Sequence, residues 1–363
     1  MRLRVLSVAY PLAPVRPDTA GGAEQILLLL DAALAREGHQ SIVVACEGST
    51  PKGELIAIPR PRGPLDEATR RQAQQECRIA VETALREREI DLIHMHGIDF
   101  DRYLPPAGVP LLATLHLPLG WYAPEALRPD RPMTYLHCVS ASQRRAAPPG
   151  AALLPDIENG VPIEALAAPV RKREIALSLG RICYEKGFHI AFDAARQAGI
   201  PFLLAGSLFR YPEHERYFHE EILPRLRPGE NRLLGPIGWK RKRRLLTAAR
   251  CLLAPSLAPE TSSLVAMEAL ACGTPVIAFP SGALAEIVEE GKTGFLVKSA
   301  GEMAEAVKAA RSLDPDACRR AARGRFSAER MIGRYLDLYR RLAARGGREG
   351  LFASQRKDRF DSD

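Results

Sequence analysis

The chain has 363 residues, of which 46% are hydrophobic and 26% charged. This is an ordinary globular composition, and at roughly 150 residues per domain it suggests two domains. Lysine and arginine outnumber aspartate and glutamate by 51 to 43, and the net charge of +8 favours anionic partners: nucleotides, phosphates, nucleic acid or an acidic membrane face. The longest strongly apolar run, residues 26–30, is far shorter than the ~18 residues of a membrane span. Residues 1–7 have the pattern of a first strand and lack the features of a signal peptide.

The first half of the chain alternates short apolar runs with segments of helical length. The runs are continuous rather than alternating with polar residues, which is typical of parallel strands covered by helices on both faces. Strands are predicted at 3–9, 41–46, 55–58, 92–95, 111–115 and 135–139, with helices at 24–37 and 66–89.

Residues 159–174 interrupt this pattern with prolines, a glycine and a cluster of charges, so a linker is predicted there. The alternation then resumes, which indicates a second doubly wound α/β unit of similar size. Its strands are predicted at 175–178, 201–205, 232–234, 251–254 and 275–279, with helices at 185–197 and 240–249.

The last segment differs from both halves. Apolar residues recur at helical spacing with arginines between them, which predicts an amphipathic helix that docks on another surface. The expected organisation is therefore a first domain at 1–165, a second at 166–325, this helix at 326–345 and a flexible tail at 346–363. The apolar residues of the helix are Ile332, Tyr335, Leu336, Tyr339 and Leu342.

The cysteines are odd in number, scattered and without a C-x-x-C pair. This usage is typical of reduced core residues in a cytosolic protein, and it argues against a cysteine-based zinc site. They are Cys46, Cys77, Cys138, Cys183, Cys251, Cys272 and Cys318.

Gly21 and Gly22 precede the first predicted helix. Glycines there expose backbone N–H groups and allow an anion or sugar to approach closely, although a plain flexible turn explains them equally well. The glycine fingerprints of dinucleotide-binding and P-loop proteins are absent, which argues against both classes.

Histidines follow two predicted strands at their carboxyl ends, where open α/β sheets bind ligands. His94 lies within an apolar run and is interpreted as structural. His116 stands just before a proline turn, where its imidazole could donate to a substrate hydroxyl or support developing positive charge.

Two cations flank the turn after the predicted strand 175–178. Arg181 follows Gly180, and Lys186 lies five residues further on, before a helix. A planar guanidinium and a compact ammonium at this position favour a phosphate clamp over two solvated surface cations.

The segment from Glu260 to Glu268 is the most informative. Ser262 or Ser263 is a natural helix N-cap, and in the following helix Glu268 falls on the apolar, inward stripe. A carboxylate there is costly unless it is paired or hydrogen-bonded. Ligand hydroxyls would satisfy it, and the alternative is a buried salt bridge to an arginine. The first-turn N–H groups near Ser263, Leu264 and Val265 favour a phosphate.

Two further patterns weigh less. The sequence Asp99-Phe100-Asp101 is literally D-x-D, but helix capping and solvated charge are preferred to metal binding. The basic run at 240–244 is interpreted as a solvated helix face, since Trp239 is its only aromatic neighbour and nucleic-acid binding calls for more.

These motifs together resemble the family 4 retaining glycosyltransferases. Glu260 and Glu268 enclose seven residues, which is the family's E-x7-E pattern, and the resemblance covers most of the chain. It implies a GT-B fold: two Rossmann-like domains that face a cleft, with the C-terminal helix crossing back to the first domain. The matching motifs are Gly21-Gly22, His116, Asn159-Gly160-Val161, Gly180-Arg181 with Lys186, Glu260 with Glu268, and the runs at 271–277 and 291–297.

The resemblance also implies roles for particular residues. Arg181 and Lys186 match the pair that binds the donor diphosphate. Glu268 matches the carboxylate that holds the ribose, Glu260 one that contacts the donor sugar, and His116 a histidine near the reaction centre. Further matches to donor-binding positions are Gly21, Gly22, Ile237, Ser262, Ser263, Leu264 and Val265.

One departure concerns the donor sugar. The family often has Phe-Gly where this chain has Ser262-Ser263, which leaves the identity of the sugar open. The expected activity is transfer of a sugar from a UDP- or GDP-sugar to a hydroxyl acceptor, with retention and without a metal or other cofactor. The acceptor would be a small molecule, glycan or lipid bound by the loops at 11–19, 60–67 and 117–129.

The expected location is the cytoplasm, with contact to the inner membrane face left open and no oligomeric state specified. A GT-B sugar phosphorylase remains the alternative function, and a basic nucleic-acid-binding protein is a weaker one.

Overall fold

The computed structural model describes residues 2–19, 21–61, 63, 65–168, 170–209 and 211–357, with side chains as far as residue 346. The chain divides into two compact units. The first comprises Met1–Ile157 and Met331–Asp363, and the second comprises Glu158–Arg330. The division falls at 157/158 rather than at the expected 165/166, and the first unit includes the C-terminal segment.

The first unit contains a seven-stranded parallel sheet of order β3-β2-β1-β4-β5-β6-β7. Its strands are β1 (Arg4–Val8), β2 (Gln40–Cys46), β3 (Glu54–Ile58), β4 (Leu92–Met95), β5 (Leu111–Leu115), β6 (Thr134–Cys138) and β7 (Leu153–Leu154). Its helices include α1 (Gly22–Arg36), α2 (Glu67–Glu87), α3 (Ala141–Arg145) and the short turns Phe100–Tyr103, Leu119–Trp121 and Pro124–Leu127.

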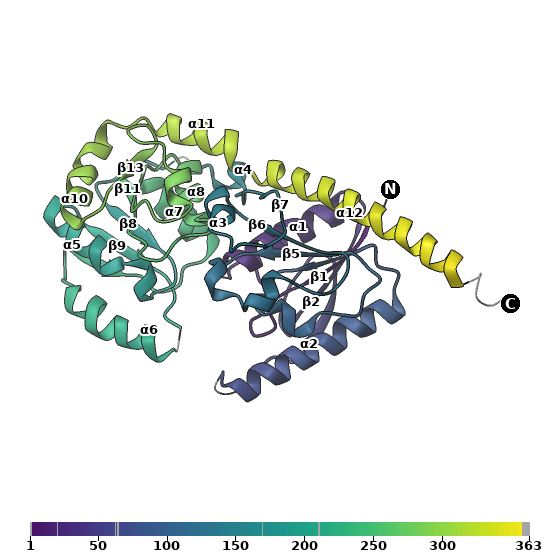
Figure 1. Ribbon diagram of the computed structural model, residues 1–363. Coiled ribbons are helices and arrows are strands. Elements are labelled where there is room, and N and C mark those ends of the chain that lie inside the picture. The colour runs from purple at the N-terminus through teal and green to yellow at the C-terminus, as the bar shows by residue number, and fades with distance from the viewer. Residues whose placement is uncertain are drawn as a thin grey trace. The chain divides into compact units, whose positions relative to one another are not determined.

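Both faces of this sheet are buried, as the continuous apolar runs predict. Leu6 and Val8 of β1 pack with α2 through Val81, while Val43 of β2 packs with α1 through Leu27. Successive side chains of a strand point to opposite faces, so the central strands need mostly apolar residues along their whole length. Helix α2 and the C-terminal helix lie on opposite sides of the sheet (Figure 1).

The second unit contains a six-stranded parallel sheet of order β10-β9-β8-β11-β12-β13. Its strands are β8 (Ala176–Leu179), β9 (Phe202–Ala205), β10 (Asn231–Leu233), β11 (Cys251–Ala254), β12 (Val276–Ala278) and β13 (Gly294–Leu296). Its helices include α4 (Ile163–Leu166), α5 (Phe188–Ala198), α6 (Pro212–Tyr217), α7 (Trp239–Ala248), α8 (Leu264–Ala271), α9 (Leu284–Ile287), α10 (Ala300–Ala309) and α11 (Pro315–Arg325).

The strand order reverses beside the first strand of each sheet. In the second unit β8 lies between β9 and β11, so the chain runs outward in one direction to β10 and then returns to the other side of β8. This change of direction beside β8 marks the carboxyl end of the sheet as the place where such sheets bind ligands.

A linker was predicted at 159–174, but residues 161–166 are part of the second unit and not a linker. Val161 pairs with Ser327 as an isolated bridge, and Val161, Ile163 and Leu166 are buried in the core of the second unit. The apolar residues of this segment are spaced among prolines and charges, which conceals their shared inward face.

Helix α12 (Ala328–Lys357) begins in the second unit and belongs to the first from Met331 onward, so the expected return to the first domain is confirmed. The buried rings of Tyr335 and Tyr339 dock it: the Tyr339 hydroxyl lies 2.6 Å from His94 Nδ1 and the Tyr335 hydroxyl 3.3 Å from Thr114 Oγ1. The helix continues to Lys357 and does not give way to a tail at Gly346. The rest of the expected tail, 358–363, lies outside the described residues.

All seven cysteines are free and buried, as expected of core residues. Within the described part of the chain, no helix combines the length and the apolar character that crossing a bilayer demands.

Candidate functional site

The loop after β8 carries Lys186 and is held tightly against the segment after β11. Gly187 has a left-handed backbone (φ 61°), and a Cβ atom there would lie 2.1 Å from the carbonyl oxygen of Pro255. The Leu257 N–H donates to the Glu185 carbonyl at 2.8 Å. Only glycine combines this φ with this close approach, so Gly187 allows the two loops to touch.

This contact brings together two of the predicted residues. Lys186 Nζ lies 2.6 Å from Glu260 Oε1, and the Ser256 hydroxyl donates to the same oxygen at 2.5 Å. The Glu260 side chain is only 13% exposed. Its backbone is also held, because the Ala283 N–H donates to the Glu260 carbonyl at 2.7 Å. Ser256 is a partner that the motif analysis missed.

Glu268 lies on the inward face of α8, as predicted, and its side chain is 2% exposed. Its partner is not an arginine: Lys242 Nζ lies 2.6 Å from Glu268 Oε1. Burial raises the pKa of Glu268, and the Lys242 charge opposes that rise. In the described part of the chain Glu268 Oε2 is buried without a hydrogen-bond partner, so a polar ligand atom could satisfy it.

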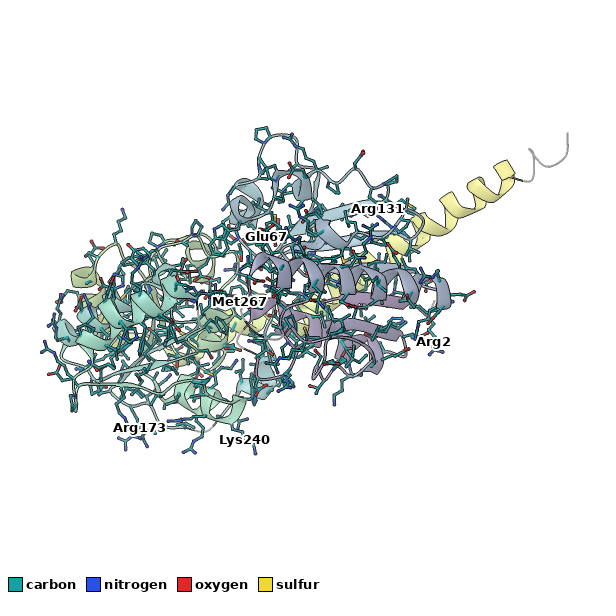
Figure 2. All side chains as sticks on the ribbon, turned by 90° about the horizontal axis from the view of Figure 1, so that it is seen from below. Arg2, Glu67, Arg131, Arg173, Lys240 and Met267 are labelled. Carbon is teal, nitrogen blue, oxygen red and sulfur yellow. The ribbon has the colours of Figure 1, made fainter. Side chains whose placement is uncertain are left out.

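The interpretation of 240–244 as a solvated helix face is therefore wrong for Lys242. Lys240 is exposed at the periphery of α7 (Figure 2), whereas the Lys242 side chain is 17% exposed and its ammonium lies 4.9 Å from the Trp239 ring centroid. A sequence signal for this exists: Trp239, Lys242 and Leu246 follow at i, i+3 and i+7, on one face of the helix.

The start of α8 differs from the expected capping. Ser263 occupies the N-cap position, but its side chain makes no capping hydrogen bond, and the Ser262 hydroxyl oxygen is buried without a partner. The first N–H groups of a helix have no intrahelical acceptor, so those of Leu264 and Val265 are candidate donors to an anion.

Arg181 and Ile237 are partly exposed in the loops after β8 and β10. Among the residues that the structure describes, no side-chain hydrogen bond or ion pair of Arg181 is seen. A further close approach was missed in the sequence: a Cβ atom on Gly206, after β9, would lie 1.7 Å from the Gly180 carbonyl oxygen. The backbone at Gly180, beside Arg181, therefore packs directly against the backbone at Gly206.

The remaining predicted residues lie in the first unit. Gly21 is the N-cap of α1 and Gly22 its first residue. His116 follows β5 and is 9% exposed, with its Nε2 3.0 Å from His96 Nδ1. The structural interpretation of His94 is confirmed, because its Nε2 lies 2.7 Å from Thr114 Oγ1 while its Nδ1 contacts Tyr339.

A fourth buried histidine, His137, joins this cluster, because its Nε2 lies 2.7 Å from Thr114 Oγ1 and its ring contacts Tyr335 of α12. Burial lowers the pKa of His116 to about 3 and that of His137 to about 4, and it lowers the pKa values of His94 and His96 well below the ordinary range. His116 is accordingly neutral near pH 7, available as a hydrogen-bonding group rather than as a fixed cation.

This cluster makes the first unit sensitive to acid. In the unfolded chain a histidine ionises near pH 6.5, but His116 and His137 remain neutral in the folded chain down to about pH 3 and 4. Between these values the unfolded chain binds more protons, so the free energy of unfolding falls as the pH drops below about 6.5. The slope is about 1.4 kcal/mol per pH unit for each such histidine.

Urea unfolding at pH 7 and pH 5 measures the effect. The chain has two tryptophans, one in each unit, so Trp239→Phe leaves Trp121 as the reporter of the first unit. We expect a lower urea midpoint at pH 5, and an unchanged midpoint would contradict the argument.

The D-x-D segment does not cap a helix through its first carboxylate. Asp99 precedes the turn Phe100–Tyr103 without a side-chain capping bond, and instead it accepts from Gln74 at 2.7 Å and from the Tyr103 hydroxyl at 3.0 Å. It ties α2 to this turn, which is a structural role.

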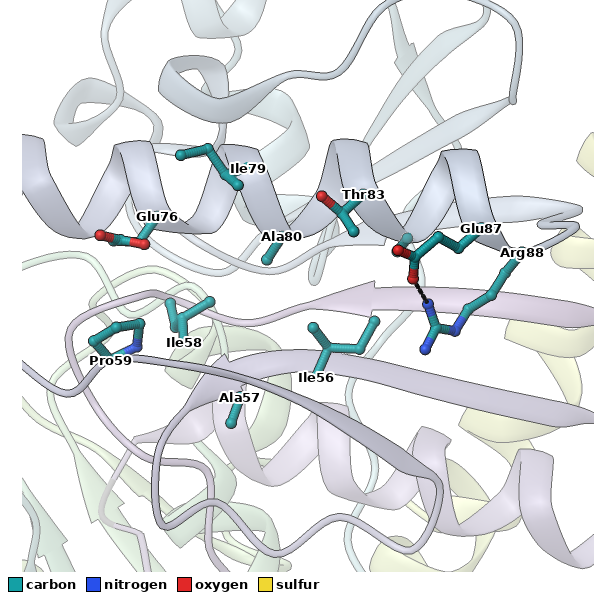
Figure 3. Close-up of a pocket in the computed structure, with 11 residues that line it drawn as sticks. Ile56, Ala57, Ile58, Pro59, Glu76, Ile79, Ala80, Thr83, Glu87 and Arg88 are labelled. Carbon is teal, nitrogen blue, oxygen red and sulfur yellow. Dashed lines mark hydrogen bonds and ion pairs between the residues drawn. The ribbon is translucent and has the colours of Figure 1, made fainter.

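A groove lies between α2 and the edge strand β3, lined by Ile56, Ile58 and Ile79, with Glu87 paired to Arg88 near one end (Figure 3). None of the predicted site residues lines it. The candidate site is therefore the set of loops at the carboxyl ends of the strands.

Each unit by itself is a parallel sheet covered by helices, with its candidate residues in loops at one end of the sheet. Two Rossmann-like units in one chain agree with the GT-B fold that the sequence resemblance implies. Residues 20–148 match the model of Glycosyltransferase Family 4, and residues 165–325 match that of Glycosyl transferases group 1. The chain belongs to the family 4, group 1 glycosyltransferases, a family of transferase enzymes.

Particular relatives agree with this assignment. The chain is 30% identical over 190 residues to the alpha-maltose-1-phosphate synthase of Mycolicibacterium smegmatis, covering 47% of this chain and 49% of that protein. It thus spans about half the length of the curated relatives it matches first.

Two solved structures have the same fold. AviGT4, a glycosyltransferase involved in avilamycin A biosynthesis, has a TM-score of 0.69 and 25% identity, covering 94% of this chain and 98% of that one. HepE of Anabaena in complex with UDP-glucose has a TM-score of 0.70 and 20% identity, covering 93% and 100%.

Proposed function

We propose that the protein transfers a sugar, with retention of configuration, from a nucleoside-diphosphate sugar to a hydroxyl acceptor. One observation carries this proposal: Glu268 is a buried carboxylate with one oxygen on Lys242 and the other without a partner. A buried acceptor without a donor is costly, and a ribose hydroxyl is a donor that would satisfy it. The HepE complex contains UDP-glucose, which supports UDP as the first nucleotide to test and GDP as the second.

The diphosphate would be bound by three groups of the second unit. Arg181 offers a guanidinium without a protein partner among the described residues. Lys186 has three N–H donors, of which Glu260 engages one, so the same ammonium can contact a phosphate and Glu260 together. The N–H groups at the start of α8 add a third set of donors.

These groups would act on the charge that develops as the glycosidic bond breaks. The electron pair passes to the diphosphate leaving group, and fixed donors stabilise it more in the transition state than in the bound donor. A leaving phosphate oxygen would accept the acceptor's hydroxyl proton on the same face. The cations supply the stabilisation in this scheme, so we propose that transfer needs no metal.

In the first unit, His116 would donate a hydrogen bond to a hydroxyl near the reacting carbon. Its neutral state near pH 7 suits this role. Gly21 and Gly22, at the start of α1, would allow the donor phosphates to approach the backbone closely. We assign acceptor recognition to the loops at 11–19, 60–67 and 117–129.

Thermal denaturation with UDP, GDP and ADP tests the proposal. A nucleotide at 100 times its dissociation constant stabilises the folded protein by about 2.7 kcal/mol, so the correct one should raise the melting temperature clearly. Its glucose and mannose conjugates would then be tested for transfer. Phosphate-dependent release of a sugar 1-phosphate would indicate a phosphorylase instead, and a lack of stabilisation by all three nucleotides would contradict donor binding.

A further inference from the structure

A cysteine, a glutamate and a histidine converge beside the candidate diphosphate site. One ligand atom from each of Cys183, Glu185 and His214 lies within 4.8 Å of the other two, the only such trio of His, Cys, Asp or Glu among the described residues. Cys183 and Glu185 belong to the loop after β8, and His214 comes from α6. The sequence argued against a cysteine-based metal site because no C-x-x-C pair occurs, but the fold assembles this set from two distant segments.

Two of the three residues are buried and Glu185 is half-buried, an environment that points to a ligand. Cys183 is fully buried and His214 is 7% exposed, and the Nδ1 atom of His214 is buried with no hydrogen-bond partner among the described residues. The imidazole is held in place, because its ring packs edge-on against Tyr211 with centroids 5.1 Å apart. An ordered imidazole with an unsatisfied buried nitrogen is costly in a protein interior, and a bound cation would remove that cost.

We propose that Cys183, Glu185 and His214 bind one divalent zinc ion. Thiolate, imidazole and carboxylate are the ligands of zinc, whereas magnesium and calcium take oxygen ligands. Ligand atoms around a tetrahedral zinc with bonds of about 2.0–2.3 Å lie about 3.3–3.8 Å apart, so small side-chain rotations close the observed trio around the ion. A water molecule completes the fourth position. The thiol proton leaves to solvent as the sulfur–zinc bond forms.

Such an ion would connect the loop of Arg181 and Lys186 to α6. The two segments already meet through α5, where the His189 N–H donates to the Tyr217 hydroxyl at 3.1 Å. Zinc would add a direct link through Cys183 and through Glu185, the residue before Lys186, and neither ligand is among the donor or sugar contacts proposed above. Because none of its ligands is a proposed donor or sugar contact, occupancy of the site does not depend on the proposed transfer reaction.

The full-length protein, freed of metal with a chelator, tests the site by direct binding. We expect one equivalent of Zn²⁺ to bind and to raise the melting temperature, and Co²⁺ to give a thiolate-to-metal charge-transfer absorption. His214→Asn should weaken Zn²⁺ binding by about 10²-fold or more. Removing a residue that only hydrogen-bonds to a metal ligand already costs about 10–100-fold in affinity, and the loss of a ligand should cost at least as much. Cys183→Ser should abolish the charge-transfer band.

His219→Asn is the matched control, because His219 is exposed on the helical stretch that follows α6, and it should bind zinc as the unaltered protein does. If Cys183→Ser does not fold, His214→Asn alone decides. The proposal is overturned if the unaltered protein takes up no stoichiometric Zn²⁺, or if the His214 variant binds it equally well. None of these measurements uses a nucleotide, so failure of the proposed transferase activity would leave their outcome unaffected.

Discussion

Replacing Lys186 by alanine is expected to lower the rate of sugar transfer by about 10²-fold or more, as for the loss of a preorganised charge partner. The ammonium would stabilise the leaving diphosphate, and it also neutralises Glu260 at 2.6 Å. Without it, Glu260 retains only the Ser256 hydroxyl among the contacts described above, and an uncompensated negative charge lies beside the phosphates. Steady-state kinetics should show the loss in kcat and kcat/KM together, because the interaction strengthens in the transition state.

Lys308→Ala is a matched control for this experiment. Lys308 Nζ lies 2.8 Å from Glu305 Oε1, in a pair on the surface of α10 whose side chains are 53% and 73% exposed. Exposed pairs contribute little to stability, so this variant should transfer sugar as the unaltered protein does. Near-normal turnover in Lys186→Ala would remove the lysine from the proposed mechanism.

Replacing Glu268 by alanine is expected to lower transfer to a similar extent, about 10²-fold or more, and to weaken binding of the nucleoside diphosphate. The carboxylate would accept ribose hydroxyls through Oε2, which has no protein partner. Calorimetric titration with the nucleotide that stabilises the unaltered protein measures this loss directly, apart from any effect on the chemical step.

Loss of nucleotide binding in Glu268→Ala could also come from a disturbed fold. Removing Glu268 leaves the half-buried Lys242 without its carboxylate, and a stranded charge can disturb a fold by itself. The double variant Glu268→Ala/Lys242→Met removes both charges and so relieves that strain. If Glu268 binds the donor, the double variant stays defective in nucleotide binding, whereas recovery of binding would show that the lysine caused the defect.

The strands that the sequence predicted best are those with an uninterrupted apolar run between clear turn residues. Residues 92–95, 111–115 and 251–254 agree with β4, β5 and β11 at both ends. β7 was missed because it has only two residues, and β13 because its three residues begin with a glycine, which is typical of a turn. Short edge strands depend on a neighbouring strand already in place, which local sequence does not record.

In the candidate site, too, the sequence predicted some features and not others. Spacing alone placed Glu268 on the inward face of its helix, because an amphipathic stripe is a local property. Its partner Lys242 comes from another helix, and the pairing of Lys186 with Glu260 depends on the close approach of Gly187 to Pro255. Pairwise contacts between segments far apart in sequence require the assembled sheet.

The sequence by itself determined the architecture of two α/β units and the residue types at the ends of their strands, since buried parallel strands demand continuous apolar runs and the loops that follow them carry the polar groups. Only the tertiary structure decided which charges neutralise one another, which buried atoms are left without partners, and that Cys183 meets His214. Those outcomes depend on distances between loops of different strands, and the packing of the sheet and its helices sets these distances.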